Sequence, residues 1–295
     1  MRKIFILFPL LFLLFVGVLL SRLMSARRVQ APEAGAVVAS GYVPYTLIKQ
    51  ISGGTVPVTM LMPPGTEPHS FEPSPGVLVG MQKAAAFVYI SDKLEPWAKD
   101  LRSALQRDTP VLVLSSTLPA QQDPHIWMNL EQVQNMARAV KDLLTQLVPE
   151  NEKLYGNNLS EFLVQVQDLQ KDFTALENCP QKDVVHIGHL AFEPLLYPYG
   201  LHLTALSGTS HEGEHSAQKL AELTKQIKQS GVKTIFTEET LSGRLAETIA
   251  RETGAQILPL YTVEHISKVD FTNNVTYAQL MRRNLDNLKR GLACP

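Results

Sequence analysis

Eight short runs of β-branched and other apolar residues, in two groups of four, alternate with helical patterns along this chain. Such runs are typical of the buried parallel strands of α/β proteins. The first group comprises Val37 to Ser40, Val56 to Met62, Ala86 to Ile90 and Val111 to Leu114. The second comprises Asp183 to Ile187, Leu203 to Leu206, Lys233 to Thr237 and Gln256 to Leu260. The sequence therefore predicts two similar α/β lobes, each with a mainly parallel four-stranded sheet.

One long helical pattern lies between the two groups. Apolar residues recur at helical spacing from Asn157 to Asn178, and Cys179-Pro180 ends the pattern. Pro149 separates it from an earlier predicted helix, Leu130 to Leu147. We expect a first lobe over residues 36–149, a linking helix over 150–178 and a second lobe over 179–295. Because a helix is a stiff connector, we do not expect large hinge motion.

Residues 1–26 have the pattern of an export signal, because Arg2 and Lys3 precede an apolar run from Ile4 to Leu20. We therefore expect a periplasmic or other cell-envelope protein. The run is about as long as the shortest membrane-spanning helices, and Met24-Ser25-Ala26 matches a cleavage site poorly. Cleavage of this signal peptide and its retention as an N-terminal anchor both stay open.

Charge argues against nucleic acid as a partner. The leader contains three of the 27 Lys and Arg and none of the 28 Asp and Glu, so the remaining chain has 24 bases, 28 acids and a formal charge of −4. The only two cysteines are Cys179 and Cys294. In an oxidising compartment they can form one disulfide, and two free or buried thiols are the alternative.

Three of the eight histidines stand where predicted strands give way to loops or helices. His69 lies in a loop with five prolines, His125 follows Asp123-Pro124 ahead of a predicted helix, and His189 follows a glycine after a predicted strand. The carboxyl ends of strands are where α/β proteins bind ligands, and neutral imidazole is a common metal ligand. Their separations of 56 and 64 residues carry no local signature, so ordinary hydrogen-bonded loop histidines are the alternative.

Several segments of the chain together form a specific pattern: Pro-Pro-Gly-x-x-Pro-His69-x-Phe-Glu-Pro-x-Pro, Leu94-Glu95-Pro96-Trp97, Asp123-Pro124-His125-x-Trp127, His189-x-Ala-Phe, Val37 to Ser40 and Tyr277 to Leu285. This pattern resembles the zinc and manganese solute-binding proteins of ABC transporters. The resemblance covers residues 36 to 290 and implies two α/β lobes, joined by one long rigid helix, with a divalent metal ion in the cleft between them.

The resemblance implies that His69 and His125 bind the metal from the first lobe and that His189 binds it from the second. Manganese-type members tend to have a carboxylate at the position of His189, so we expect Zn²⁺, with Mn²⁺ as the alternative. The preference of imidazole for zinc agrees with this expectation.

At the fourth ligand position this sequence departs from the family pattern. An Asp is common in the family, and it falls here on Val263 or, with a shift of one residue, on Glu264. We expect Glu264 to be the ligand, with water or His265 as the alternatives. The expected function is capture of a divalent metal by a monomer and delivery to an ABC-type membrane permease.

Two other functions stay open from the sequence. The segment from His211 to His215 satisfies H-E-x-x-H, a zinc-protease signature in which His211, Glu212 and His215 would act together. Gly208 and Gly213 disfavour the helix that this motif needs, so we do not expect an enzyme. A metal-binding adhesin or storage protein would need the same site. No G-x-x-x-x-G-K motif occurs, so ATP hydrolysis would belong to a partner.

Three further polar residues have expected supporting roles. His186, inside a predicted strand, and His202, next to one, are expected to be buried and hydrogen-bonded. Glu238 ends a predicted strand, where its carboxylate could orient a metal-bound histidine by accepting the ring N–H.

Overall fold

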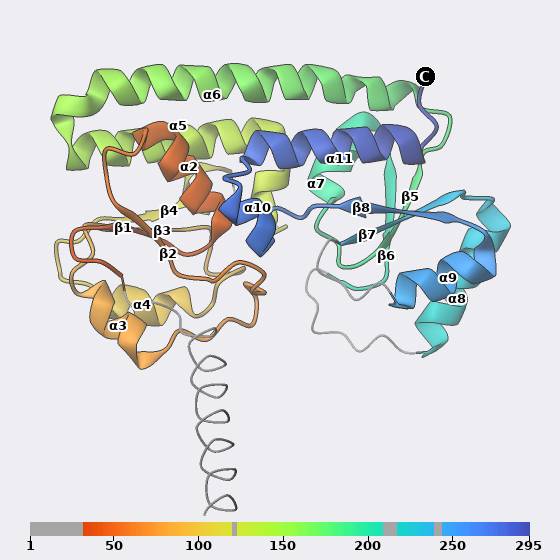
Figure 1. Ribbon diagram of the computed structural model, residues 1–295, viewed down its shortest axis with the longest axis horizontal. Helices are drawn as coiled ribbons and strands as arrows, with labels where there is room; N and C mark the ends of the chain where they lie inside the picture. Colours follow the sequence, from red (N-terminus) through yellow and green to blue (C-terminus); the bar gives the residue numbers. More distant parts are fainter. Residues whose placement is uncertain (1–31, 120–122, 209–216, 239–243) are drawn as a thin grey trace, which may run out of the picture.

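The computed structural model describes residues 32–119, 123–208, 217–238 and 244–295, and its ribbon contains two parallel four-stranded sheets (Figure 1). The strand orders are β2-β1-β3-β4 and β6-β5-β7-β8, so the two sheets repeat one arrangement. The predicted α/β class is confirmed, and each predicted strand is found within two residues at either end. The strands are β1 (Val37–Ala39), β2 (Val58–Met60), β3 (Ala86–Tyr89), β4 (Val111–Val113), β5 (Asp183–Ile187), β6 (His202–Ala205), β7 (Thr234–Glu238) and β8 (Gln256–Leu260).

We call residues 36–149 the N-terminal lobe and residues 179–295 the C-terminal lobe. Alternate residues of β1 point to opposite faces of its sheet. Val37 and Ala39 pack into the large central core, whereas Val38 packs into a smaller outer cluster with α3 and α4. The helices of this lobe are α2 (Tyr42–Ser52), α3 (Pro75–Met81), α4 (Ala98–Ala104) and α5 (Leu130–Leu147).

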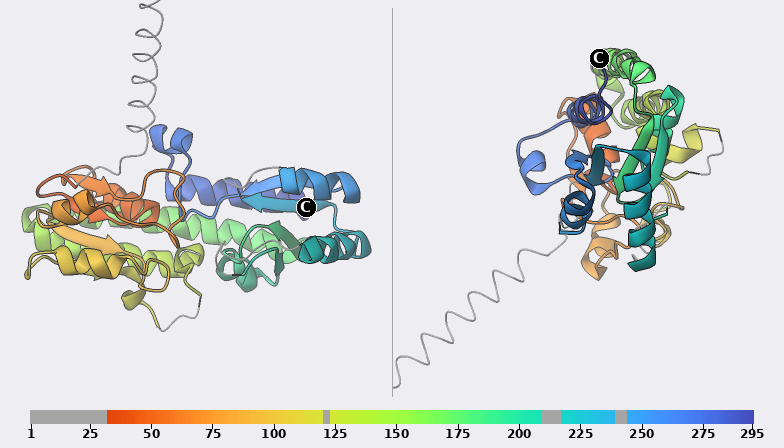
Figure 2. Two further views of the ribbon diagram at one scale, coloured as in Figure 1. Left: turned by 90° about the horizontal axis from the view of Figure 1, so that it is seen from below. Right: turned by 90° about the vertical axis from the view of Figure 1, so that its right-hand side faces the viewer.

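The C-terminal lobe repeats this layering. Val184 and Phe236 pack into the central core, whereas Val185 and Ile235 pack outward into a cluster with α8 and α9. In the right-hand view of Figure 2, which looks along the long axis, α11 lies on one side of the strands and α8 and α9 lie on the other. The helices of this lobe are α7 (Glu193–Leu196), α8 (Ala217–Ser230), α9 (Arg244–Thr253), α10 (Lys268–Thr272) and α11 (Tyr277–Gly291).

Helix α6 (Glu152–Phe173) runs over both lobes and shares their central core (Figure 1). It packs against α2 and α5 on one side and against α11 on the other. The predicted range, Asn157 to Asn178, is wrong at both ends. The helix begins five residues earlier, with Gly156 inside it, and Thr174–Asn178 form a 3₁₀ helix instead. A glycine inside the helix costs about 1 kcal/mol relative to alanine, which the burial of Tyr155, Leu159 and Phe162 offsets.

The C-terminal ends of helices α6 and α11 are joined covalently. Cys179, just after the short 3₁₀ turn that follows α6, forms a disulfide with Cys294, just beyond α11. Among the residues that the structure describes, no helix is both long and apolar enough to cross a membrane. The leader, residues 1–26, lies outside the described residues.

Removing the disulfide should destabilise the chain. The bridge joins residues 115 apart, and closing a loop of that size in the unfolded state typically contributes about 2–4 kcal/mol. We expect the Cys179→Ala/Cys294→Ala variant to unfold at lower denaturant concentration than the intact chain by that amount. Denaturant titration followed by circular dichroism measures the difference.

A reductant provides the matched control. It should lower the midpoint of the intact chain to that of the variant and leave the variant unchanged. Two titratable thiols in the denatured, unreduced intact chain would contradict the bridge.

Candidate metal site

The four residues predicted to bind a metal come together between the two lobes. Each follows the carboxyl end of a strand: His69 after β2, His125 after β4, His189 after β5 and Glu264 after β8. One ligand-type atom from each lies within 4.8 Å of all the others. His125, His189 and Glu264 are buried, and the His69 side chain is about one-tenth exposed.

The distances among these atoms are close to those around a single tetrahedral ion. The Nε2 atoms of His125 and His189 lie 3.1 Å apart. Glu264 Oε2 lies 3.8 Å from His125 Nε2 and 3.6 Å from His189 Nε2. Ligands about 2.0–2.1 Å from a tetrahedral ion are roughly 3.4 Å from one another. Shifts of a few tenths of an ångström would therefore bring these three atoms onto one ion.

A carboxylate orients His125. Asp123 Oδ1 accepts hydrogen bonds from the Nδ1–H and from the backbone N–H of His125, both at 2.8 Å. This contact fixes the tautomer whose bare Nε2 faces the other ligands. Asp123 has no role predicted from the sequence, although an acid two residues before a loop histidine is a recognisable signal.

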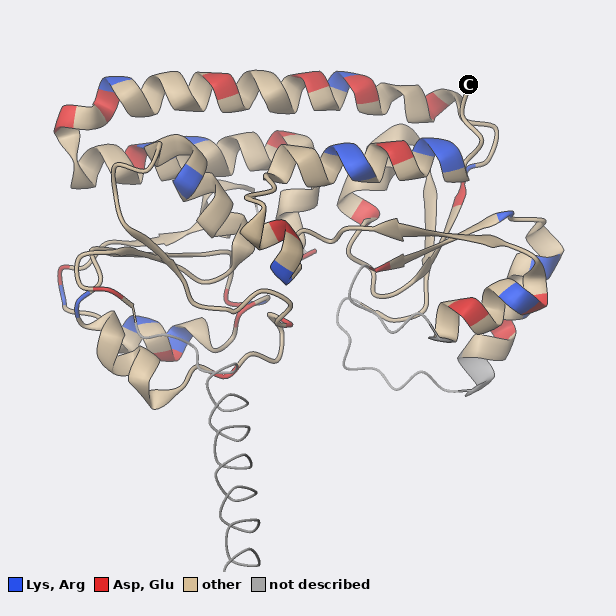
Figure 3. Ribbon diagram, viewed as in Figure 1, with Lys and Arg blue, Asp and Glu red and all other residues tan. Residues whose placement is uncertain are grey.

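A second carboxylate orients His189. Glu238 Oε1, at the end of β7, accepts the Nδ1–H of His189 at 2.7 Å and its backbone N–H at 2.8 Å. Gly188 is needed for this contact, because a Cβ there would lie 2.3 Å from Glu238 Oε1. Asp183 and Glu238 are the only charged residues in the described strands, and only Glu238 is buried (Figure 3).

Glu264 carries a buried negative charge. Neither of its carboxylate oxygens accepts a hydrogen bond from the part of the chain that the structure describes. Burial raises the pKa of this carboxyl, but the imidazoles of His189, His125 and His265 outweigh burial and lower it to about 2. A buried carboxylate without hydrogen bonds is costly unless a cation compensates it, so the site fits a divalent ion.

The same charges act on His189. Burial lowers the pKa of its imidazole, but Glu238 and Glu264 outweigh burial and raise it to about 10. His189 is then protonated at neutral pH in the metal-free chain, and an incoming ion must displace that proton.

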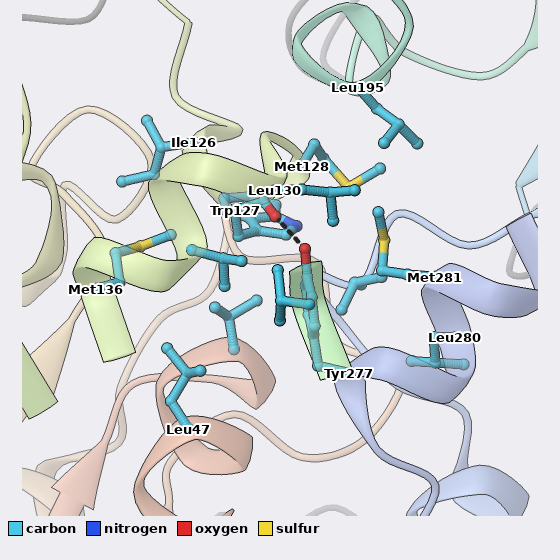
Figure 4. Packing of buried hydrophobic residues seen from close by; sticks show 14 of the residues in the cluster. Leu47, Ile126, Trp127, Met128, Leu130, Met136, Leu195, Tyr277, Leu280 and Met281 are labelled. Carbon is cyan, nitrogen blue, oxygen red and sulfur yellow. Dashed lines mark hydrogen bonds between the residues drawn. The ribbon is translucent and has the colours of Figure 1, made fainter. Parts of the chain in front are cut away.

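Trp127 connects the loops that carry His125 and Glu264. Its indole N–H donates to the carbonyl of Thr262 at 2.7 Å. The hydroxyl of Tyr277 donates to the carbonyl of Trp127 at 2.7 Å (Figure 4). Val263, between Thr262 and Glu264, has a φ of 62°. This left-handed conformation costs a β-branched residue about 1–3 kcal/mol, so the packing around it must hold the Glu264 loop in place.

Other residues of the N-terminal lobe hold the loop that carries His69. The indole N–H of Trp97 donates to the carbonyl of Pro68 at 2.9 Å. Two residues before Trp97, the buried carboxyl of Glu95 accepts the backbone N–H of Ile90 at 2.6 Å. Burial raises the pKa of Glu95 to about 7, against the opposing effect of its hydrogen bonds.

His265 is buried and is not among the four converging residues, and the other histidines divide into three cases. His186 is buried and hydrogen-bonded, as predicted: its Nδ1–H donates to the carbonyl oxygen of His189, with Nδ1 and the oxygen 3.2 Å apart. The prediction that His202 is buried is wrong, because it begins the edge strand β6 and its side chain is 76% exposed. His211, Glu212 and His215 of the H-E-x-x-H segment lie outside the described residues.

Comparisons with known proteins agree with this architecture. Residues 37–291 match the family model "Zinc-uptake complex component A periplasmic". The high-affinity zinc uptake system protein ZnuA of Bacillus subtilis is 31% identical, with 87% of each chain covered. The chain spans 58% of the length of the Streptococcus pyogenes zinc-binding proteins AdcA that it also matches.

Two solved structures are similar over most of this chain. The Zn(II)-bound ZnuA-like domain of Streptococcus pneumoniae AdcA is 30% identical, with a TM-score of 0.78, and the match covers 88% of this chain and 99% of that one. The laminin-binding protein Lmb of Streptococcus agalactiae is described as bifunctional, with adhesin and metal-transporting activity. It is 31% identical, with a TM-score of 0.79, over 88% of this chain and 100% of that one.

Glu95 should make stability depend on pH. Because folding raises its pKa from 4.5 to about 7, the neutral form is favoured in the folded state. The stabilisation is complete below pH 4.5 and is lost as the pH rises through 7. The free energy of unfolding should therefore fall by about 3 kcal/mol over this range. Denaturant titrations of the intact chain and of Glu95→Gln at pH 5 and pH 8 measure this contribution.

The variant Glu95→Gln cannot ionise, so its unfolding free energy should lack this decrease. Glu150→Gln, at an exposed position, is the matched control and should follow the intact chain. A Glu95→Gln profile parallel to that of the intact chain would exclude Glu95 as the source.

Proposed function

The chain belongs to the family of periplasmic zinc-uptake components, and from that premise we propose that it captures Zn²⁺ outside the cytoplasm and delivers it to an ABC-type permease. The observation that carries the proposal is the convergence of His69, His125, His189 and Glu264 between the lobes. Three imidazoles and one carboxylate form a donor set that suits zinc better than manganese, which prefers oxygen ligands.

In this proposal each residue has a distinct role. His69 and His125 bind the ion from the N-terminal lobe, and His189 and Glu264 bind it from the C-terminal lobe. Asp123 and Glu238 hold the imidazoles with Nε2 toward the ion. Binding displaces the proton of His189, so zinc affinity should fall as the pH decreases.

The remaining features of the proposal follow from export and the fold. Residues 1–26 direct the chain across the membrane and are then cleaved or kept as an anchor. The mature protein acts as a monomer of two lobes, residues 36–149 and 179–295, with residues 150–178 linking them and the Cys179–Cys294 disulfide formed. It has no enzymatic activity of its own.

Adhesion is the second candidate function, because the similar protein Lmb is described as both an adhesin and a metal transporter. Growth of a deletion strain under chelation distinguishes the two. Rescue by added Zn²⁺ supports uptake, whereas a defect only in surface attachment supports adhesion. Peptide cleavage that disappears in Glu212→Gln would instead support the protease alternative.

Zinc binding should depend on the four ligands. The chelator-stripped chain is expected to bind one equivalent of Zn²⁺ more tightly than Mn²⁺. Single replacement of His69, His125, His189 or Glu264 by Ala should weaken binding by more than the roughly 10–100-fold that a supporting residue contributes. Competition titration against a chromophoric chelator measures these affinities. His202→Ala removes an exposed imidazole and should bind as the intact chain does.

Glu238→Gln tests the supporting role separately. Losing the carboxylate that orients His189 should weaken Zn²⁺ binding by about 10–100-fold without abolishing it. Asp183→Asn changes the other acidic strand residue and is the matched control. Equal affinities for the two variants would show that Glu238 does not support the site.

A further inference from the structure

A second group of metal-binding side chains adjoins the proposed zinc site. Glu238, Glu264 and His265 each offer one ligand-type atom, and these atoms lie within 4.8 Å of one another. All three residues are at most 5% exposed. Glu264 belongs to both groups, so the second group lies directly beside the first.

The two groups differ in which lobe supplies them. Glu238 is the last residue of β7, and Glu264 and His265 follow the neighbouring strand β8. The second group therefore comes entirely from the C-terminal lobe. The first group also requires His69 and His125 from the N-terminal lobe, so movement of these two side chains away from the ion disrupts the first group and leaves the second intact.

Charge favours a cation at the second position. Two buried carboxylates close together repel one another, and the oxygens of Glu264 accept no hydrogen bond from the described residues. One imidazole and two carboxylates are common zinc ligands, and a water can complete the four-coordinate shell. An open shell of this kind exchanges its ion more easily than a closed set of four protein ligands.

The two positions compete for the same side chains. An ion at either position uses Glu264, and Glu238 also holds the imidazole of His189. An ion that moves toward Glu238 therefore weakens the contact between Glu238 and His189, and with it the first group of ligands. Successive occupation by one ion fits this sharing better than simultaneous occupation by two.

We propose that Glu238, Glu264 and His265 form a second Zn²⁺ position, which holds the ion on the C-terminal lobe after His69 and His125 release it. This inference rests on the proposed function, because it describes a step in the transfer of the same ion. The second position makes release a two-step process, in which His69 and His125 release the ion before it leaves the C-terminal lobe.

The test removes the N-terminal ligands and asks whether His265 then binds. In the full chain, His69→Ala/His125→Ala should still bind one Zn²⁺, more weakly than the intact chain. Adding His265→Ala should weaken this remaining binding by at least about 10-fold, the lower range of losses for groups around a metal. Adding His202→Ala, at an exposed position, should not change it.

Cobalt provides a spectroscopic readout of the same change. The visible absorption of Co²⁺ bound to His69→Ala/His125→Ala should change when His265→Ala is added. Co²⁺ bound to the otherwise intact chain should keep its spectrum in His265→Ala, because His265 is not a ligand at the first position.

The outcomes separate this inference from the proposed function. If the intact chain binds zinc but His69→Ala/His125→Ala binds none, or if His265→Ala has no further effect, the second position is excluded and the first stands. If the intact chain binds no zinc, the proposed function itself fails.

A kinetic measurement keeps the inference testable if the double variant does not fold. In the otherwise intact chain, His265→Ala should slow the release of Zn²⁺ to excess chelator, because the ion loses its intermediate position. An unchanged release rate would overturn the proposal.

Discussion

The hydrogen bond from the Trp127 indole to the Thr262 carbonyl sets the distance between the two lobes where the ligands meet. Trp127 follows His125 by two residues, and Thr262 precedes Glu264 by two, so one bond fixes a ligand from each lobe. The Tyr277 hydroxyl holds the other side of Trp127 through its carbonyl. Because this contact is buried, water cannot replace a lost partner, and breaking it leaves a costly unsatisfied carbonyl.

This interlobe contact continues into a common core, which limits how the site can open. The central core runs from the face of β1 through α6 to α11 without a break between the lobes. A hinge between whole lobes would expose that core, at about 25 cal/mol for every Å² of apolar surface. Rearrangement of the ligand loops costs far less.

The sequence predicted regular elements better than individual contacts. Residues Leu130–Leu147 form α5 as predicted, because Asn129 caps the helix and Pro149 follows it. The start of α6 was missed because packing outweighs the low helix propensity of Gly156. His202 was expected to be buried, but edge position in a sheet depends on strand order, which the local pattern does not encode. The four candidate ligands came from family resemblance, since spacing alone does not reveal which loops meet.

Glu238 illustrates the physical limit of such prediction. Asp183 and Glu238 both lie at strand ends, yet one is exposed and the other is buried against His189. The difference arises from strand order and direction: Asp183 begins β5, whereas Glu238 ends β7, at the carboxyl edge where all four candidate ligands gather. Burying Glu238 and Glu264 together places two negative charges in a region of low polarizability. A divalent cation bound at this edge would compensate both charges.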